Sequence, residues 1–89
     1  MNAARPSTQA RVLATVIRIA GPSRTPPDAG PETSLADGGF GLDSVDMLEL
    51  IVACEQEFGI ELDPKALLAT DALRSAGGLA QVVQSALEA

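Results

Sequence analysis

The chain has no histidine, tryptophan or tyrosine, only two phenylalanines, and one cysteine among its 89 residues. Without histidine, Ser-His-Asp and Cys-His nucleophilic sites and every imidazole metal ligand are excluded. The single cysteine, Cys54, cannot form an internal disulfide, which favours a reducing, cytoplasmic location over secretion. With so few aromatic residues, the core has to come from Leu, Val, Ile and Ala, which suits small packed helices.

Long apolar runs are also missing. No stretch approaches the roughly 20 apolar residues that a membrane span needs, and residues 1–24 lack the apolar run of a signal peptide. We therefore expect no membrane partner. The length of 89 residues allows one domain. We expect a flexible tail over residues 1–6 and a single domain over residues 7–89.

The net charge of −6 is unevenly distributed along the chain. Residues 1–24 contain four arginines and no acidic residue, whereas residues 25–89 contain twelve acidic residues against Lys65 and Arg74. The acidic part repels nucleic acid and attracts basic protein partners. The alternative is that these acids only increase solubility.

The sequence predicts an all-α fold, a small four-helix bundle of three main helices and one short helix, with a long loop between the first two. Ser7 can cap the first helix, and Gly21-Pro22 ends it. Residues 21–34, GPSRTPPDAGPETS, hold too much proline and glycine for a helix or a central strand. We expect this loop to be extended in part, with Leu35 and Phe40 buried as anchors near its end.

The other helices also have recognisable ends. Asp43 can cap the second helix in a capping box with Asp46, and Gly59 ends it after Phe58. Asp63-Pro64 begins a short third helix through Leu68. Ser75 can cap the last helix, whose apolar residues recur at helical spacing: Leu79, Val82, Val83, Ala86 and Leu87.

The second helix has two apolar faces when it is drawn at about 100° per residue. The first is a core stripe of Met47, Leu50, Ile51, Cys54 and Phe58. The second, which we call the outer strip, consists of Val45, Leu48 and Val52, flanked by Glu49, Gln56 and Glu55. A helix in a small bundle buries only one stripe. The outer strip therefore either packs under residues 21–34 or is an exposed docking surface with an acidic rim.

Ser44 lies directly after the cap Asp43 and is expected to point outward from the first helical turn. The free N–H groups and the positive dipole end of the helix stabilise an anion there. The glycines Gly38, Gly39 and Gly41 leave the approach open. Because the flanking aspartates would repel a freely bound phosphate, a phosphate attached covalently by an enzyme fits better. Asp43 then helps to bind the Mg²⁺ that accompanies the phosphate donor.

The segment GLDSVDMLELIVACEQEFGIEL, residues 41–62, resembles the acyl carrier proteins at their phosphopantetheine attachment site. The likeness consists of Gly-x-Asp-Ser before an aliphatic residue, then Asp46, then Glu49-Leu50, then an acidic stretch ending in Phe-Gly-Ile. It extends weakly over residues 7–88. The resemblance implies a carrier rather than an enzyme. It implies that Ser44 receives a 4′-phosphopantetheine arm from coenzyme A and carries acyl groups as thioesters.

The same resemblance implies the partners of the carrier. They are a phosphopantetheinyl transferase, which requires Asp43, and a ketosynthase, an acyltransferase or a ligase-type enzyme of the pathway. We expect the carrier itself to be a monomer. The residues implied to contact partners are Val45, Leu48, Glu49, Val52 and Glu55. The unusual loop and the excess of Arg over Lys favour polyketide or related specialised metabolism over a housekeeping fatty-acid role. The alternatives are a peptidyl or aminoacyl carrier and, from a different class, a non-carrier helical interaction module.

The remaining polar and glycine residues have ordinary structural interpretations. We expect Cys54 to pack in the core and Arg11 and Arg18 to lie on a solvent-facing side of the first helix. The acids Glu55, Glu57 and Glu61 do not share one helical face, so we predict no metal site. The Gly77-Gly78 pair fits the first turn of the last helix rather than a nucleotide site. We predict no catalytic residue.

Overall fold

A computed structural model describes residues 7–89, and the tail predicted over residues 1–6 lies outside them. The described chain forms the predicted all-α bundle with four α-helices and one 3₁₀ turn. These elements are α1 (Thr8–Ala20), α2 (Ser44–Phe58), α3 (Pro64–Leu68), η1 (Asp71–Leu73) and α4 (Ala76–Glu88). The 3₁₀ turn was not predicted.

Each helix begins where a short polar side chain satisfies a free N–H group of the first turn. Ser7 accepts a hydrogen bond from the Ala10 N–H, and Ser75 accepts one from the Gly78 N–H. Asp63 caps α3, with Pro64 at its first position. The predicted helix starts are therefore confirmed.

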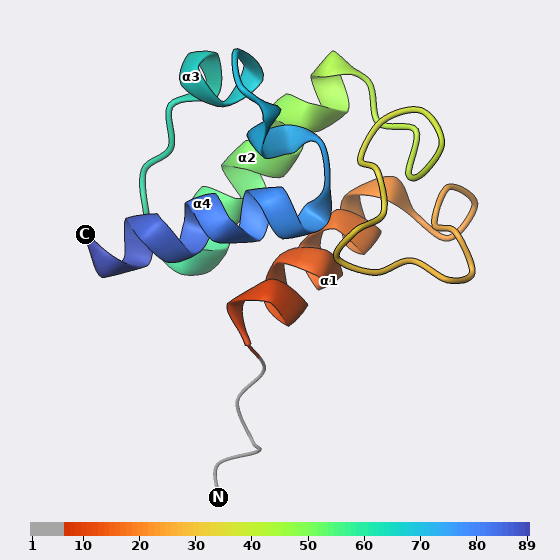
Figure 1. Ribbon diagram of the computed structural model, residues 1–89, viewed down its shortest axis with the longest axis horizontal. Coiled ribbons are helices and arrows are strands. Elements are labelled where there is room, and N and C mark those ends of the chain that lie inside the picture. Colours follow the sequence, from red (N-terminus) through yellow and green to blue (C-terminus); the bar gives the residue numbers. More distant parts are fainter. Residues whose placement is uncertain (1–6) are drawn as a thin grey trace, which may run out of the picture.

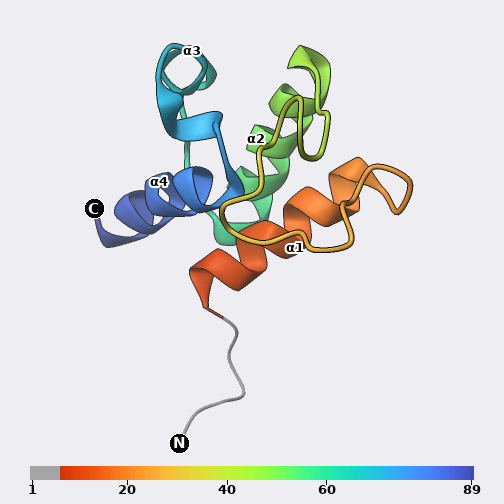
Figure 2. The ribbon, with the colours of Figure 1, turned by 45° about the vertical axis from the view of Figure 1, so that its right-hand side comes forward.

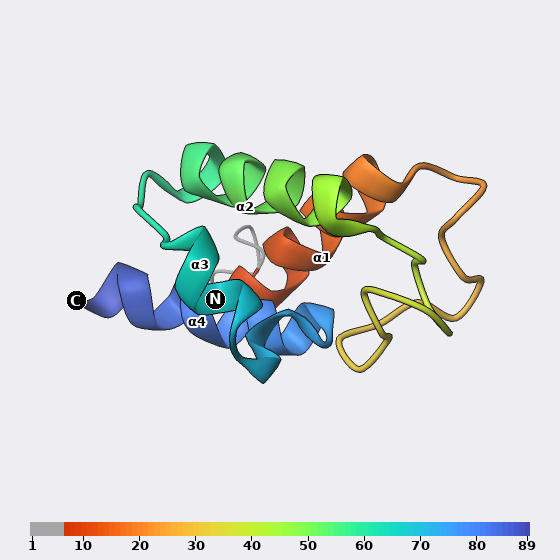
Figure 3. The same ribbon diagram turned by 90° about the horizontal axis from the view of Figure 1, so that it is seen from above.

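The helices α1, α2 and α4 enclose the core, with α1 packed against both α4 and α2. In Figure 1, α4 lies across the front of the molecule and α2 passes behind it. Figure 3 shows the loop between α1 and α2 gathered at one side, beyond the end of α1 and the start of α2, and in Figure 2 this loop passes in front of the two helices. The start of α2 is therefore at the edge of the bundle, next to this loop.

The core is aliphatic, as the composition requires, and α2 contributes its predicted stripe. Met47, Leu50, Ile51 and Cys54 are buried, while Phe58 is half-buried at the end of the helix. The other fully buried large side chains come from α1, the loop and α4: Val12, Val16, Leu35, Phe40, Leu79 and Val83. Leu35 and Phe40 are the loop anchors that the sequence predicts.

The long loop is folded into successive turns and is tied to the first turn of α4 and to Arg74, just before that helix. The Leu35 N–H donates to the Arg74 carbonyl at 3.0 Å, and the Gly77 N–H donates to the Pro31 carbonyl at 2.7 Å. Of the three glycines before α2, Gly39 serves this fold, whereas an added Cβ on Gly38 or Gly41 would meet nothing within 4 Å. A Cβ atom on Gly39 would lie 2.0 Å from the Ser34 carbonyl oxygen, so only glycine fits there.

One detail of the helix faces differs from the prediction, and one contact adds to it. The buried face of α4 begins earlier and uses small residues, because Ala76, Leu79, Ala80 and Val83 are buried while Leu87 is exposed. On α1, Arg18 is exposed as expected, and the side chain of Arg11 is 38% exposed. The Arg11 guanidinium pairs with the Glu57 carboxylate at 3.1 Å and lies 4.3 Å from the centroid of the Phe58 ring. Arg11 therefore joins α1 to the end of α2.

Candidate functional site

Two aspartates cap the start of α2, and the serine between them takes no part in the cap. The Asp43 carboxylate accepts a hydrogen bond from the Asp46 N–H at 2.9 Å, and the Asp46 carboxylate accepts one from the Asp43 N–H at 3.1 Å. This is the predicted capping box. Ser44 is the first residue of α2 and is exposed. Because Asp43 caps the helix, the exposed Ser44 side chain is not needed as a cap.

An arginine from the long loop also reaches this turn, and sequence reasoning missed it. Nη1 of Arg24 lies 2.8 Å from Oδ2 of Asp46. The hydrogen bond from Arg24, and after it the one from the Asp43 N–H, holds the pKa of Asp46 below its ordinary value. The only signal in the sequence was the absence of acids near Arg24 in residues 1–24. The capping box is thus an ionic network anchored to the loop.

The outer strip of α2 is exposed, which excludes packing under residues 21–34. The exposed fractions are 66% for Val45, 44% for Leu48 and 48% for Val52. With Ile19 of α1 and Glu49, Ala53 and Gln56 of α2, these side chains line a groove of about 470 Å³. An apolar groove that begins one residue after Ser44 is suited to docking another molecule beside that hydroxyl.

The five residues predicted to contact partners differ in solvent exposure and in their hydrogen bonds within the protein. Val45, Leu48, Val52 and Glu49 are exposed. Glu55 is half-buried, and its Oε2 atom accepts a hydrogen bond from the Leu62 N–H at 2.8 Å. The carboxylate of Glu55 is therefore engaged in a hydrogen bond within the protein.

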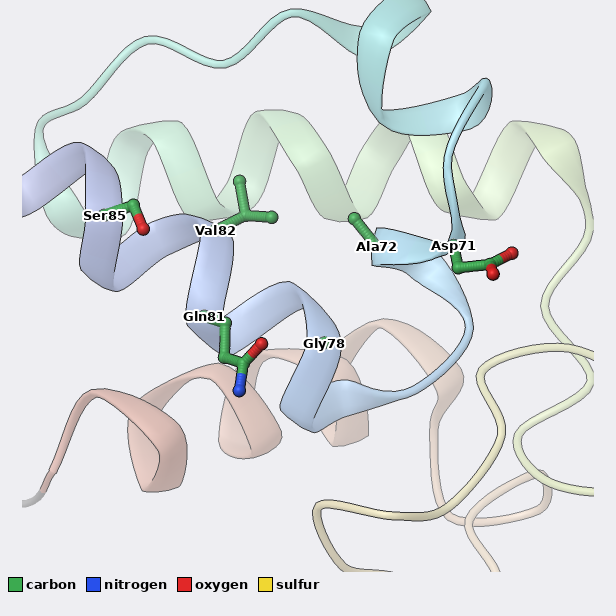
Figure 4. Close-up of a pocket in the computed structure, with 6 residues that line it drawn as sticks. All are labelled: Asp71, Ala72, Gly78, Gln81, Val82 and Ser85. Carbon is green, nitrogen blue, oxygen red and sulfur yellow. The ribbon is translucent and has the colours of Figure 1, made fainter.

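A second cavity, of about 510 Å³, lies between η1 and α4 (Figure 4). None of its lining residues belongs to α1 or α2: Asp71, Ala72, Gly78, Gln81, Val82 and Ser85. It is separate from the groove beside Ser44 and brings no reactive group to it.

The other residues singled out in the sequence make no site within residues 7–89. No group of three or more His, Cys, Asp or Glu residues in this part of the chain is placed to hold a metal ion. Cys54 is buried, and desolvation raises the pKa of its thiol to about 11. Gly77 and Gly78 lie in the first turn of α4. No helix among these residues is long and apolar enough to cross a membrane.

Comparison with known proteins gives one match. A family model described as a phosphopantetheine attachment site matches residues 10–83. The matched range contains the capping box, Ser44 and the whole outer strip. No curated protein and no solved structure matches the chain.

Proposed function

Because the chain belongs to the phosphopantetheine attachment family, we propose that Ser44 is the residue that bears its arm. Domains of this family hold 4′-phosphopantetheine covalently and are carriers rather than enzymes. This membership removes the alternative of a non-carrier interaction module. The proposal for Ser44 rests on one observation: its hydroxyl is exposed at the start of α2 while Asp43 does the capping.

The chemistry at Ser44 is a phosphoryl-group transfer. The Ser44 oxygen forms a bond to the phosphorus next to the pantetheine of coenzyme A, and the adenosine bisphosphate portion leaves. The hydroxyl proton passes to a base of the transferase. One oxygen of Asp43 is held by the Asp46 N–H, and the other is available to support the Mg²⁺ of the transferase complex. The bound arm supplies a thiol that carries acyl groups as thioesters.

The residues Val45, Leu48, Glu49, Val52 and Glu55 form the proposed docking surface for the transferase and the pathway enzymes. The exposed apolar groove and the exposed Glu49 support this assignment. An apolar strip with acids at its rim favours fast, salt-sensitive docking to basic surfaces. A brief encounter of this kind suits a carrier that visits several active sites in turn.

We further propose a pathway type, an assembly state and a location. Leu42-Asp43 before the serine and the unusual loop favour acyl cargo in polyketide or related specialised metabolism. The partners are then a ketosynthase, an acyltransferase or a ligase-type enzyme, and a peptidyl or aminoacyl carrier is the alternative. We expect residues 7–89 to act as one monomeric domain. The thiol of the arm requires a reducing compartment, which favours the cytoplasm.

One experiment tests the attachment site. The purified chain is incubated with coenzyme A, Mg²⁺ and a broad-specificity phosphopantetheinyl transferase, and its mass is measured. The wild type and the control Ser85→Ala, which removes an exposed hydroxyl from α4, should each gain one arm. Ser44→Ala should gain none. An arm on Ser44→Ala would show that another residue is modified. The mass of the protein from its native producer identifies the cargo and the pathway.

A further inference from the structure

We propose that Arg24 is a positioning residue that holds the first turn of α2, and with it Ser44, against the end of α1. This inference deepens the proposed function and rests on Ser44 being the attachment site. Arg24 is in the long loop, which no motif of the family explains. It is the one residue whose side chain reaches from this loop both to the last turn of α1 and to the capping box of α2 within residues 7–89.

The contacts of Arg24 form a strap between two helix ends. Its Nε donates to the Ala20 carbonyl at 3.0 Å, and its Nη2 donates to the Ile19 carbonyl at 3.4 Å. These carbonyls belong to the last turn of α1, where carbonyl groups have no partner within the helix. Its Nη1 donates to Asp46 of α2 at 2.8 Å. One guanidinium therefore satisfies the end of α1 and pairs with the start of α2.

The strap ends at Asp46, two residues from Ser44. The same oxygen of Asp46, Oδ2, accepts hydrogen bonds from Arg24 and from the Asp43 N–H. Asp43 precedes Ser44 in the chain, and its own carboxylate returns a bond to the Asp46 N–H. Arg24 therefore acts on Ser44 through Asp46 and Asp43.

Positioning matters at this place because the N–H groups of a first helical turn have no partner within the helix and depend on the cap. Without a partner from outside α2, the capping box restrains the turn relative to its own helix but not relative to α1. A transferase needs the hydroxyl at a defined position, and an error of about 1 Å can slow a reaction strongly. A lysine could keep the charge, but it lacks the planar fork that bonds Asp46 and the α1 carbonyls together.

The test compares Arg24→Gln and Arg24→Lys with Arg18→Gln. Arg18 is exposed on α1, so its substitution is a matched control for the loss of one positive charge. The rate of arm transfer is measured at saturating coenzyme A over a range of carrier concentrations. Amide hydrogen exchange of Asp43 and Asp46 is measured by NMR on the same folded proteins.

We expect Arg24→Gln to lower kcat for arm transfer about fivefold, in keeping with the largest effects of exposed ion pairs. Its amides at Asp43 and Asp46 should exchange faster, while those of α4 should not. Arg24→Lys should recover part of the rate, and Arg18→Gln should change at most KM. A double variant, Arg24→Gln with Asp46→Asn, should be no slower than Asp46→Asn alone.

The inference is overturned if Arg24→Gln keeps the kcat and the exchange rates of Arg18→Gln, or if its kcat rises. It is also overturned if only KM changes, because that result assigns Arg24 to the encounter with the transferase. Should Arg24→Gln fail to fold, Arg24→Lys decides the question by the same two readouts. A wild-type chain that gains no arm at Ser44 contradicts the proposed function instead.

Discussion

The carboxylate of Glu55 accepts a hydrogen bond of 2.8 Å from the backbone N–H of Leu62. Glu55 is in the last turn of α2, and Leu62 is in the connection that leads to α3. The bond gives a partner to an N–H group that no helix satisfies. A residue that the sequence marks as a partner contact therefore also shapes the connection between the two helices.

Removal of this bond should destabilise the protein in a graded way. Glu55→Ala is expected to lower the free energy of unfolding by about 1 kcal/mol, because the Leu62 N–H loses its acceptor. Glu55→Gln should lose less, since the amide oxygen can still accept. Urea denaturation measures both, with Glu61→Ala as a control at an exposed acid of the same connection. Equal losses for the Ala and Gln variants would show that charge, not the hydrogen bond, is what matters.

Substitutions on the buried face of α2 should lower stability, and substitutions on the outer strip should weaken docking. Leu50 is fully buried and Leu48 is 44% exposed. Leu50→Ala is expected to cost about 3 kcal/mol of unfolding free energy, and Leu48→Ala less than about 1 kcal/mol. Leu48→Ala should instead raise the KM of the transferase for the carrier. The docking surface is wrong if Leu48→Ala unfolds as easily as Leu50→Ala while the KM per folded molecule stays unchanged.

The helix starts could be predicted because each depends on a side chain three residues away or less. Ser7, Asp43 and Ser75 each accept from an N–H group of their own first turn, so the local sequence contains the whole interaction. The exposure of Ser44 follows from the same logic, because Asp43 caps the helix in its place. The outer strip was equally visible, since helical spacing alone divides two apolar stripes.

The contacts that could not be predicted join parts of the chain that only the fold brings together. Arg24 and Asp46 are 22 residues apart, and Arg11 and Glu57 are 46 residues apart. The local sequence around an arginine does not indicate which distant carboxylate the fold will place beside it. The buried face of α4 was misjudged for a related reason: Ala76 and Ala80 add little to an apolar pattern, although their small size allows close packing.

The Asp46 carboxylate should make the free energy of unfolding depend on pH in the acidic range. Its folded-state pKa is lowered, first by the hydrogen bond from Arg24, so the ionised carboxylate favours the folded state above the ordinary pKa of 3.8. That contribution is lost as the pH falls through the lower folded-state value. In urea titrations the wild type should be more stable than Asp46→Asn at pH 7, and the gap should shrink as the pH falls below the ordinary pKa of 3.8 and through the lower folded-state pKa.

The matched control for this measurement is Asp28→Asn, which removes an exposed carboxylate from the loop. Its urea midpoint should stay close to that of the wild type at neutral pH. A gap between wild type and Asp46→Asn that persists unchanged into strong acid would mean that the charge of Asp46 contributes nothing, and that Asn disturbs the cap in another way.

Because the chain has one cysteine, the number of thiols that react with a reagent reports both on arm attachment and on folding. Cys54 is fully buried, and desolvation, helped by the charge of Glu57, raises the pKa of its thiol to about 11. At pH 8 only about one thiol in a thousand would be ionised even if reagent could reach it. Before arm attachment, the folded protein should therefore show no thiol to an aromatic disulfide reagent, and the urea-unfolded protein should show one. After attachment the folded protein should show one reactive thiol and the unfolded protein two, because the thiol of the arm is exposed to solvent.

A folded, unmodified protein that reacts promptly would mean that the reagent reaches Cys54 through opening of the core between α1 and α2. Hydrogen exchange of the Ile51 amide would then be fast as well.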